Sequence, residues 1–212
     1  MKIAIDSRIY KMFPLLGTFS GASEMLVRRL ASDLAKAGHS VHVVGAIGEE
    51  DLEIEGVHYW PERFHPVRCD VLIAEQDISH LRDFAFSRLF VDLNRIDPVL
   101  AGVEDEVDGF ICHSQTHARM LREKNPTIRE EQIIVIPYGT DLVPLKIVQK
   151  VPNRLIYCAS PDRGLIHMAR AWPYLHALVP GISIDVTYDF NSYFERLKWV
   201  SDEEASRAWE VK

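Results

Sequence analysis

The sequence has little cysteine, no excess of positive charge and no long hydrophobic run. Its 212 residues include three cysteines, an odd number spread along the chain, which favours reduced thiols in a cytoplasmic protein over a disulfide framework. The 24 Lys and Arg residues against 31 Asp and Glu residues give a net charge of −7, which argues against a non-specific nucleic-acid-binding protein. No stretch reaches about 18 apolar residues, so we predict no transmembrane segment. Asp6 interrupts the first apolar run, which argues against a signal peptide.

Several motifs of nucleotide, metal and hydrolase chemistry are also missing. Neither G-x-G-x-x-G nor G-x-x-x-x-G-K-[ST] occurs, so the two commonest phosphate-binding fingerprints are absent. His113 and His117 are four residues apart, but no glutamate stands between them as in H-E-x-x-H, and we predict no metal site. Without G-x-S-x-G the sequence gives no support to a hydrolase triad.

What the chain does contain is an alternation of short apolar runs and amphipathic segments. KIAID (2–6) predicts a buried strand, and EMLVRRLASDLAKAGH (24–39) predicts a helix with Leu26, Leu30 and Leu34 on one face. SVHVVGA (40–46) completes a β-α-β unit. Further strands are expected at 56–60, 70–74, 88–93, 109–114 and 131–137, and helices at 79–88, 99–107 (or a turn) and 116–125. This alternation predicts an α/β fold with a mostly parallel, Rossmann-like sheet covered by helices on both faces.

The pattern changes after residue 141. Residues 142–153 have no clean period and carry two prolines, so we interpret them as a connector. A strand at 154–160, a helix within 164–181 and a strand at 183–190 then begin a second β-α-β unit. We therefore predict a complete domain over 1–145, followed by a connector and the incomplete start of a second domain over 146–212.

The junction before the first predicted helix offers small residues to a ligand. Ser20, Gly21 and Ala22 lead into this helix, and Glu24 follows in its first turn. Small residues let backbone N–H groups approach an anion at a helix N-terminus. The alternative is a flexible loop with an ordinary helix cap.

A second junction, CASPDRGL (158–165), follows a strand of the second unit. Open α/β sheets bind ligands at the carboxyl ends of their strands, and Arg163 adds a cation whose geometry suits a diphosphate. The alternative is that Pro161 and Asp162 only start a helix and that Arg163 is solvated.

Four segments, in order, resemble the retaining glycosyltransferases of family four, which have the GT-B fold. SGASEMLVRRLASDLAKAGHSVHVV (20–44) is similar to the family's turn, helix and G-H-x-V segment, and IPYGTD (136–141) to its I-P-N-G-V-D. RLIYCASPDRGLIHMARAWPYLHALVPGISIDVTY (154–188) resembles its strand, basic turn and A-W-P-x-L helix, and is most like a subgroup with A-S-S-P-D-R-G-L. The resemblance covers nearly the whole chain.

The resemblance implies transfer of a sugar from a nucleotide-sugar donor to an unknown acceptor, without a metal or other cofactor. The acceptor would bind to the N-terminal domain and the donor to the C-terminal one. By position, Gly21, Ala22, Ser160, Arg163 and Gly164 would bind the donor and its diphosphate.

The chain departs from the family at the catalytic position. Where many members have a histidine after a strand, this sequence has Asp92 and Asn94, which become the candidate catalytic residues. The remaining positions that the resemblance places along the cleft are Ser20, Glu24, Ser114, Tyr138, Gly139 and Asp141.

The family's donor motif, two glutamates eight residues apart in a glycine-rich setting, has no convincing counterpart. Glu123 and Glu131 have the spacing but are interrupted by Pro126, and Glu195 and Glu203 lack neighbouring glycines. We therefore expect a chain truncated within the donor-side domain, with weak nucleotide-sugar binding and little or no turnover alone. One alternative is a non-catalytic remnant that binds a sugar or an anion and needs a partner chain or self-associates through its incomplete domain. Another is a different doubly wound enzyme, such as an epimerase.

Overall fold

The computed structural model describes residues 1–8, 22–45, 50–61, 63, 67–93, 102, 104–139, 149–188 and 190. The chain divides into two compact units, Met1–Thr140 and Asp141–Lys212. Each is described by itself.

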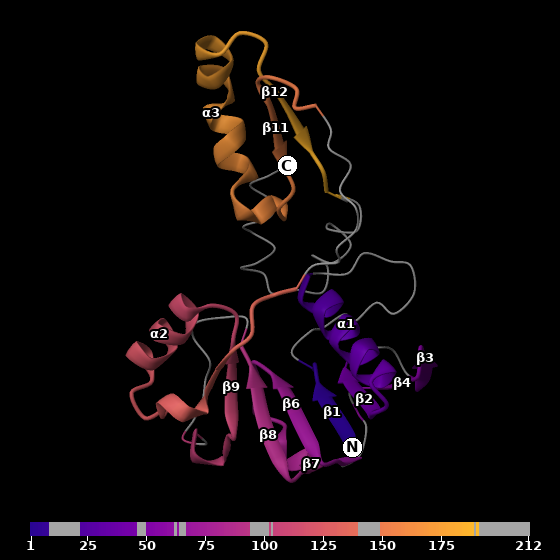
Figure 1. Cartoon of the computed structure of the whole chain (residues 1–212). Coiled ribbons are helices and arrows are strands. Elements are labelled where there is room, and N and C mark those ends of the chain that lie inside the picture. The colour runs from indigo at the N-terminus through magenta and orange to yellow at the C-terminus, as the bar shows by residue number, and fades with distance from the viewer. Residues whose placement is uncertain are drawn as a thin grey trace. The chain divides into compact units, whose positions relative to one another are not determined.

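The first unit contains an eight-stranded sheet with the order β10-β9-β8-β6-β1-β2-β4-β3 (Figure 1). Its strands are β1 (Lys2–Asp6), β2 (Ser40–Gly45), β3 (Leu52–Ile54), β4 (Val57–Pro61), β6 (Val71–Glu75), β8 (Arg88–Asp92), β9 (Gly109–Cys112) and β10 (Ile133–Val135). Neighbouring strands are parallel, except that β3 pairs antiparallel with β4. β1 lies between β2 and β6: the strands β2, β4 and β3 extend the sheet on one side of β1, and β6, β8, β9 and β10 extend it on the other. The carboxyl end of the sheet between β1 and β6 is therefore the topological switch point, where open α/β sheets bind ligands.

Two apolar clusters cover the two faces of this sheet. Along β1, Ile3 and Ile5 belong to one cluster together with Val27 of α1 (Ala22–Lys36). Ala4 belongs to the other, which includes Leu121 of α2 (Gln115–Lys124). Successive residues of a strand point to opposite faces, so α1 and α2 pack on opposite faces of the sheet. The predicted α/β fold, with a mostly parallel sheet between helices, is confirmed.

One local prediction is wrong. The segment 79–88 is not a helix but a short 3-10 turn at Leu81–Asp83, followed by β7 (Phe84–Ala85), which pairs in parallel with β5 (Val67–Arg68). Burial of the Phe84 side chain in the core favours this extended backbone over the helix that the local pattern suggests. At 99–107, where a helix or a turn was expected, the described residues form a 3-10 turn, Glu104–Glu106, in agreement with the turn.

The hairpin that joins β3 to β4 was not predicted. Its two turn residues, Glu55 and Gly56, have φ of +52° and +76°, as a two-residue hairpin with the right-handed twist of the strands requires. Glutamate in that conformation is uncommon, so the sequence E-G is a weaker turn signal than N-G.

The second unit consists of one β-α-β arrangement among its described residues. β11 (Arg154–Tyr157) and β12 (Ser183–Val186) pair in parallel, and α3 (Leu165–Leu178) connects them after a 3-10 turn at Pro161–Arg163. The elements predicted for this segment are confirmed. None of the helices described in either unit is long and apolar enough to cross a membrane.

Candidate functional site

The carboxyl ends of the parallel strands in the first unit carry polar side chains. β1 ends in Asp6, β6 in Glu75 and β8 in Asp92, and His113 directly follows β9. Asp6 and Glu75 are each only 3% exposed. Charged side chains are rarely buried without a role, so this edge of the sheet is the first candidate for a site.

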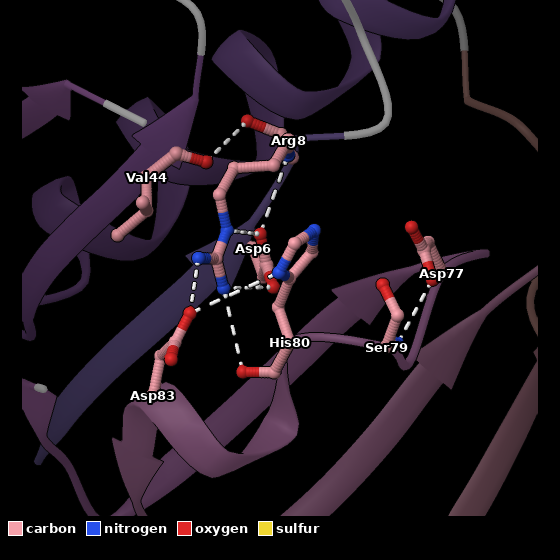
Figure 2. Close-up of polar contacts among 8 residues, drawn as sticks. Asp6, Arg8, Val44, Asp77, Ser79, His80 and Asp83 are labelled. Carbon is pink, nitrogen blue, oxygen red and sulfur yellow. Dashed lines mark hydrogen bonds and ion pairs between the residues drawn. The ribbon is translucent and has the colours of Figure 1, made fainter. Parts of the chain in front are cut away.

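At the switch point, Arg8 is held by carboxylates from both sides, as Figure 2 shows. Its Nη1 donates to Oδ2 of Asp83 at 2.5 Å, its Nη2 donates to the carbonyl of His80 at 3.4 Å, and it makes two further bonds to Asp6. Burial opposes the guanidinium charge, but the hydrogen bonds to Asp6 and Asp83 outweigh it and raise the pKa of Arg8. Arg8 therefore anchors the chain where it leaves β1.

A second polar cluster joins the ends of β8, β9 and β10. Nε2 of His113 lies 2.9 Å from Oδ1 of Asp92, and the two side chains are 12% and 15% exposed. Nδ1 of His113 lies 3.0 Å from the carbonyl oxygen of Ile136. The ring of Tyr138 stacks on the imidazole with 3.9 Å between the ring centroids. We call Asp92, His113 and Tyr138 the strand-end cluster.

Burial has the largest effect on the ionisable groups of the strand-end cluster, and the charge of Asp92 adds to it. Burial raises the pKa of Asp92, although His113 and His117 act in the opposite direction. Burial, together with the charges of Asp92 and Glu75, raises the pKa of Tyr138 to about 12. Asp92 and Glu75 therefore both disfavour ionisation of the Tyr138 hydroxyl.

Helix α2 begins beside this cluster. Ser114 caps the helix, because its Oγ accepts the backbone N–H of His117 at 3.0 Å. Nδ1 of His117 in turn accepts the backbone N–H of His113 at 3.4 Å. Nδ1 of His117 therefore carries no proton in that contact, so in the neutral imidazole the proton is on Nε2.

Three buried polar atoms of this region have no aligned hydrogen bond within the part of the chain that the structure describes. They are Oδ1 of Asp92, Nε2 of His113 and Nε2 of His117. The first two form an ion pair at 2.9 Å, so of the three only Nε2 of His117 has neither a hydrogen bond nor an ion pair among the described residues. An unsatisfied buried polar group costs about 1–3 kcal/mol, and such groups concentrate at functional sites. This cost marks the strand-end cluster as the best candidate site of the first unit.

The backbone beside Asp92 is also unusual. Gln76, just after β6, has a φ of +57°, and its N–H donates to the carbonyl of Asp92 at 2.9 Å. A non-glycine residue in the left-handed region is uncommon, and such residues cluster at active sites and ligand clamps.

In the second unit, the predicted diphosphate turn presents an exposed cation at a helix N-terminus. The guanidinium of Arg163 is 77% exposed, and its Nε lies 3.6 Å from Oδ2 of Asp162. Gly164, with a φ of +110°, immediately precedes α3. Ser160 donates its hydroxyl proton to Asp162, so this hydroxyl already has a partner. A helix N-terminus and an exposed arginine suit a phosphate group.

The structure brings together some of the residues that the sequence nominated. Asp92 and Tyr138 meet through His113, with Ser114 beside them and Gly139 next to Tyr138 in the chain. Ala22 and Glu24 lie in the first turn of α1. The candidates outside the described residues are Ser20, Gly21, Asn94 and Asp141.

Sequence reasoning missed Arg8 and Glu75, and it considered His113 only as a metal ligand. Their shared signal is position: each lies at, or within two residues of, the carboxyl end of a parallel strand. Among the described residues, no group of three His, Cys, Asp or Glu side chains could hold a metal ion.

The sheet order, the helices on both faces and the polar strand ends define a Rossmann-like α/β fold of the GT-B type. The chain is similar in structure to sucrose-phosphate synthase from Thermosynechococcus elongatus, with a TM-score of 0.60 and 14% sequence identity over 95% of this chain and 67% of that chain. The catalytic domain of starch synthase IV from Arabidopsis thaliana, bound to ADP and acarbose, matches with a TM-score of 0.48 and 10% identity over 87% of this chain and 67% of that one. No protein-family model and no curated protein sequence matches the chain. At 14% identity, the likeness to sucrose-phosphate synthase concerns the fold.

Proposed function

We propose that this chain takes part in glycosyl transfer from a nucleotide-sugar donor to an acceptor hydroxyl. The observation that carries the proposal is a partly buried carboxylate–imidazole pair, Asp92 and His113, at the strand ends of a fold shared with sucrose-phosphate synthase. A metal site, a hydrolase triad or a dinucleotide fingerprint would favour another class, and the sequence carries no motif for any of them.

On this proposal the first unit binds the acceptor. The Asp92 carboxylate accepts hydrogen bonds from sugar hydroxyl groups, and the Tyr138 ring, 52% exposed, offers an apolar surface to a sugar ring. A few convergent polar groups beside an aromatic surface are what small polar ligands require.

The second unit would bind the donor diphosphate. Arg163 and the N-terminus of α3 offer positive charge to it. In the reaction, the bond from the anomeric carbon to the diphosphate oxygen breaks and a bond to the acceptor oxygen forms. The acceptor proton passes to the departing diphosphate or to Asp92, according to the stereochemical course. Arg163 would stabilise the charge that develops on the leaving group.

Calorimetric titration with UDP-glucose, GDP-mannose and ADP-glucose tests the proposal. We expect weak binding of at least one of them, reduced about tenfold or more in Arg163→Ala, since a charge-assisted hydrogen bond contributes about 1.5–3 kcal/mol. Arg170→Ala is the matched control, because Arg170 is an exposed arginine later in α3.

Two results would count against the proposal. Binding that Arg163→Ala leaves unchanged would remove the diphosphate site from this turn. No binding of any nucleotide sugar would contradict donor recognition by the chain.

A further inference from the structure

Resting on the proposed function, we propose that His113 is the positioning residue of the acceptor subsite: it holds the Asp92 carboxylate and the Tyr138 ring in one arrangement, which selects a neutral sugar over a phosphorylated one.

His113 connects three strand ends. It directly follows β9, its Nε2 contacts Asp92 at the end of β8, and its Nδ1 contacts the carbonyl of Ile136, just after β10. Its ring also supports that of Tyr138, two residues beyond Ile136. A single side chain thus sets the relative positions of a carboxylate and an aromatic ring that are 46 residues apart in the sequence.

The hydrogen bonds of His113 fix where its protons lie. A carbonyl oxygen can only accept, so Nδ1 must donate to Ile136 and must carry a proton. One further proton can lie between Nε2 and Oδ1 of Asp92, which are 2.9 Å apart. If that proton is on Nε2, the two groups form an imidazolium–carboxylate pair. If it is lost, a buried carboxylate faces a nitrogen lone pair, which is unfavourable.

Contacts with His117 orient the imidazole of His113 further. The backbone N–H of His113 donates to His117, whose own N–H is held by the cap of α2. The ring of His117 lies 6.3 Å from that of His113, centroid to centroid. His113 is therefore constrained from the β8, β10 and α2 sides, as a residue that positions a binding group must be.

The charges that face the strand-end cluster favour an uncharged ligand. His113 and His117 act on Asp92, and Asp92 in turn acts on the Cys112 thiol and the Tyr138 hydroxyl. Glu75, at the end of β6, adds a second negative charge near that hydroxyl. Arg8, the buried cation of the switch point, is already engaged by Asp6 and Asp83. A phosphate placed at Tyr138 would meet like charges, whereas sugar hydroxyl groups can donate to the carboxylates.

Two substitutions separate the roles of the two nitrogens. His113→Gln places an amide nitrogen near the position of Nε2 and keeps a contact with Asp92, whereas His113→Asn places one near Nδ1 and keeps only the bond to Ile136. His176→Gln, at an exposed histidine in α3, is the control. Asp92→Asn removes the charge and retains the shape.

The readouts are NMR titrations of the full chain with glucose, fructose and glucose 6-phosphate, observed at the His113 and Tyr138 rings, and the ultraviolet titration of Tyr138. We expect the neutral sugars to bind more tightly than glucose 6-phosphate. We expect binding to fall about tenfold in His113→Asn, to fall less in His113→Gln and to be unchanged in His176→Gln. In Asp92→Asn, the His113 ring signals should shift and the pKa of Tyr138 should fall below its value of about 12.

Equal sugar binding by the wild type and by His113→Asn would overturn the positioning role. NMR signals of the His113 ring that do not shift in Asp92→Asn would also overturn it. Tighter binding of glucose 6-phosphate, or binding of no sugar, would overturn the acceptor class. Sugar binding as expected, together with a failed nucleotide-sugar titration, would contradict the proposed function and leave this subsite intact.

Discussion

Arg8 and Asp6, two residues apart at the end of β1, form a doubly hydrogen-bonded ion pair: Nε donates to Oδ1 and Nη2 to Oδ2, both at 2.8 Å. The remaining arm of the guanidinium reaches Asp83, 75 residues further along the chain. Both side chains of the pair are 3% exposed, so neither charge is stabilised by water. The fold depends on their mutual neutralisation.

Replacing Arg8 should therefore destabilise the first unit strongly. Arg8→Met retains much of the side-chain volume but leaves the Asp6 carboxylate buried without its cation. Breaking a buried ion pair costs about 3–5 kcal/mol, and urea unfolding should show a loss of this size. Arg29→Met is the control, because the Arg29–Asp33 pair is more than half exposed and should contribute at most about 1 kcal/mol. Equal losses in the two variants would contradict the structural role of Arg8.

A second prediction concerns His42 and pH. Trp60 donates its indole N–H to Nδ1 of His42 at 3.0 Å, and burial lowers the pKa of His42 to about 4. In the unfolded chain the pKa is near 6.5, so the unfolded state takes up the proton first as the pH falls. Stability should be complete above pH 6.5, decrease by about 3 kcal/mol between pH 6.5 and 4, and then level off.

Urea unfolding at a series of pH values measures this effect. His42→Gln should lower stability at pH 7.5 and flatten the dependence between pH 6.5 and 4, whereas His176→Gln should leave that dependence as it is in the wild type. A wild-type slope that persists in His42→Gln would assign it to other groups.

Asp6 and Asp92 should respond in opposite ways to replacement by asparagine. Burial raises the pKa of Asp92, so ionisation of this carboxyl lowers the stability of the folded state. The loss of stability is absent at pH values below the ordinary pKa of Asp and is complete at pH values above the raised pKa of Asp92. Asp92→Asn should therefore stabilise the protein at pH 7 by about 0.5–2 kcal/mol, the range of typical single stabilising substitutions. Asp6→Asn should destabilise it, because Asp6 neutralises Arg8. Chemical denaturation of both variants at pH 7 and pH 3.5 measures these changes in stability. If Asp92→Asn were less stable than the wild type at pH 7, the pair of Asp92 with His113 would be net favourable.

A fourth prediction uses two glycines of the second unit. Gly164 and Gly181 have φ of +110° and +76°, so alanine is strained at both positions and should lower thermal stability by about 1–2 kcal/mol. Gly164 precedes α3 at the proposed diphosphate turn, whereas Gly181 lies beyond its other end. Only Gly164→Ala should also weaken binding of UDP or ADP in calorimetry. Equal weakening by both would indicate a general effect on folding.

The sequence predicted the helices and the mostly parallel sheet because their signals are local and repeated. α1 and α2 have apolar residues at helical spacing, and their observed bounds follow the predicted ones closely. The 79–88 segment was wrongly predicted as a helix because its extended conformation depends on a partner strand. Phe84 pairs with Val67, and no local sequence pattern reveals this pairing. β3 was missed because only three residues form it, at the edge of the sheet.

The candidate site was only partly predictable for a related reason. Asp92 was nominated from a resemblance, but its contact with His113 depends on the register of two strands, in which Asp92 lies opposite Ile111. A register is a tertiary property, set by packing across the sheet. Arg8 likewise lies beside Asp83 only because β1 and β6 are neighbours.

The central place of β1 also determines when the sheet can form on the ribosome. β1 is synthesised first, yet Ile3 pairs with Val41 on one side and with Val71 on the other. At about 5–20 residues per second, a strand that leaves the ribosome early waits about 4–14 s for a partner that lies some 70 residues later. During this interval β1 can pair only with β2, and its other edge has no partner strand. A strand from the middle of the finished sheet therefore remains an unpaired edge until β6 has been synthesised.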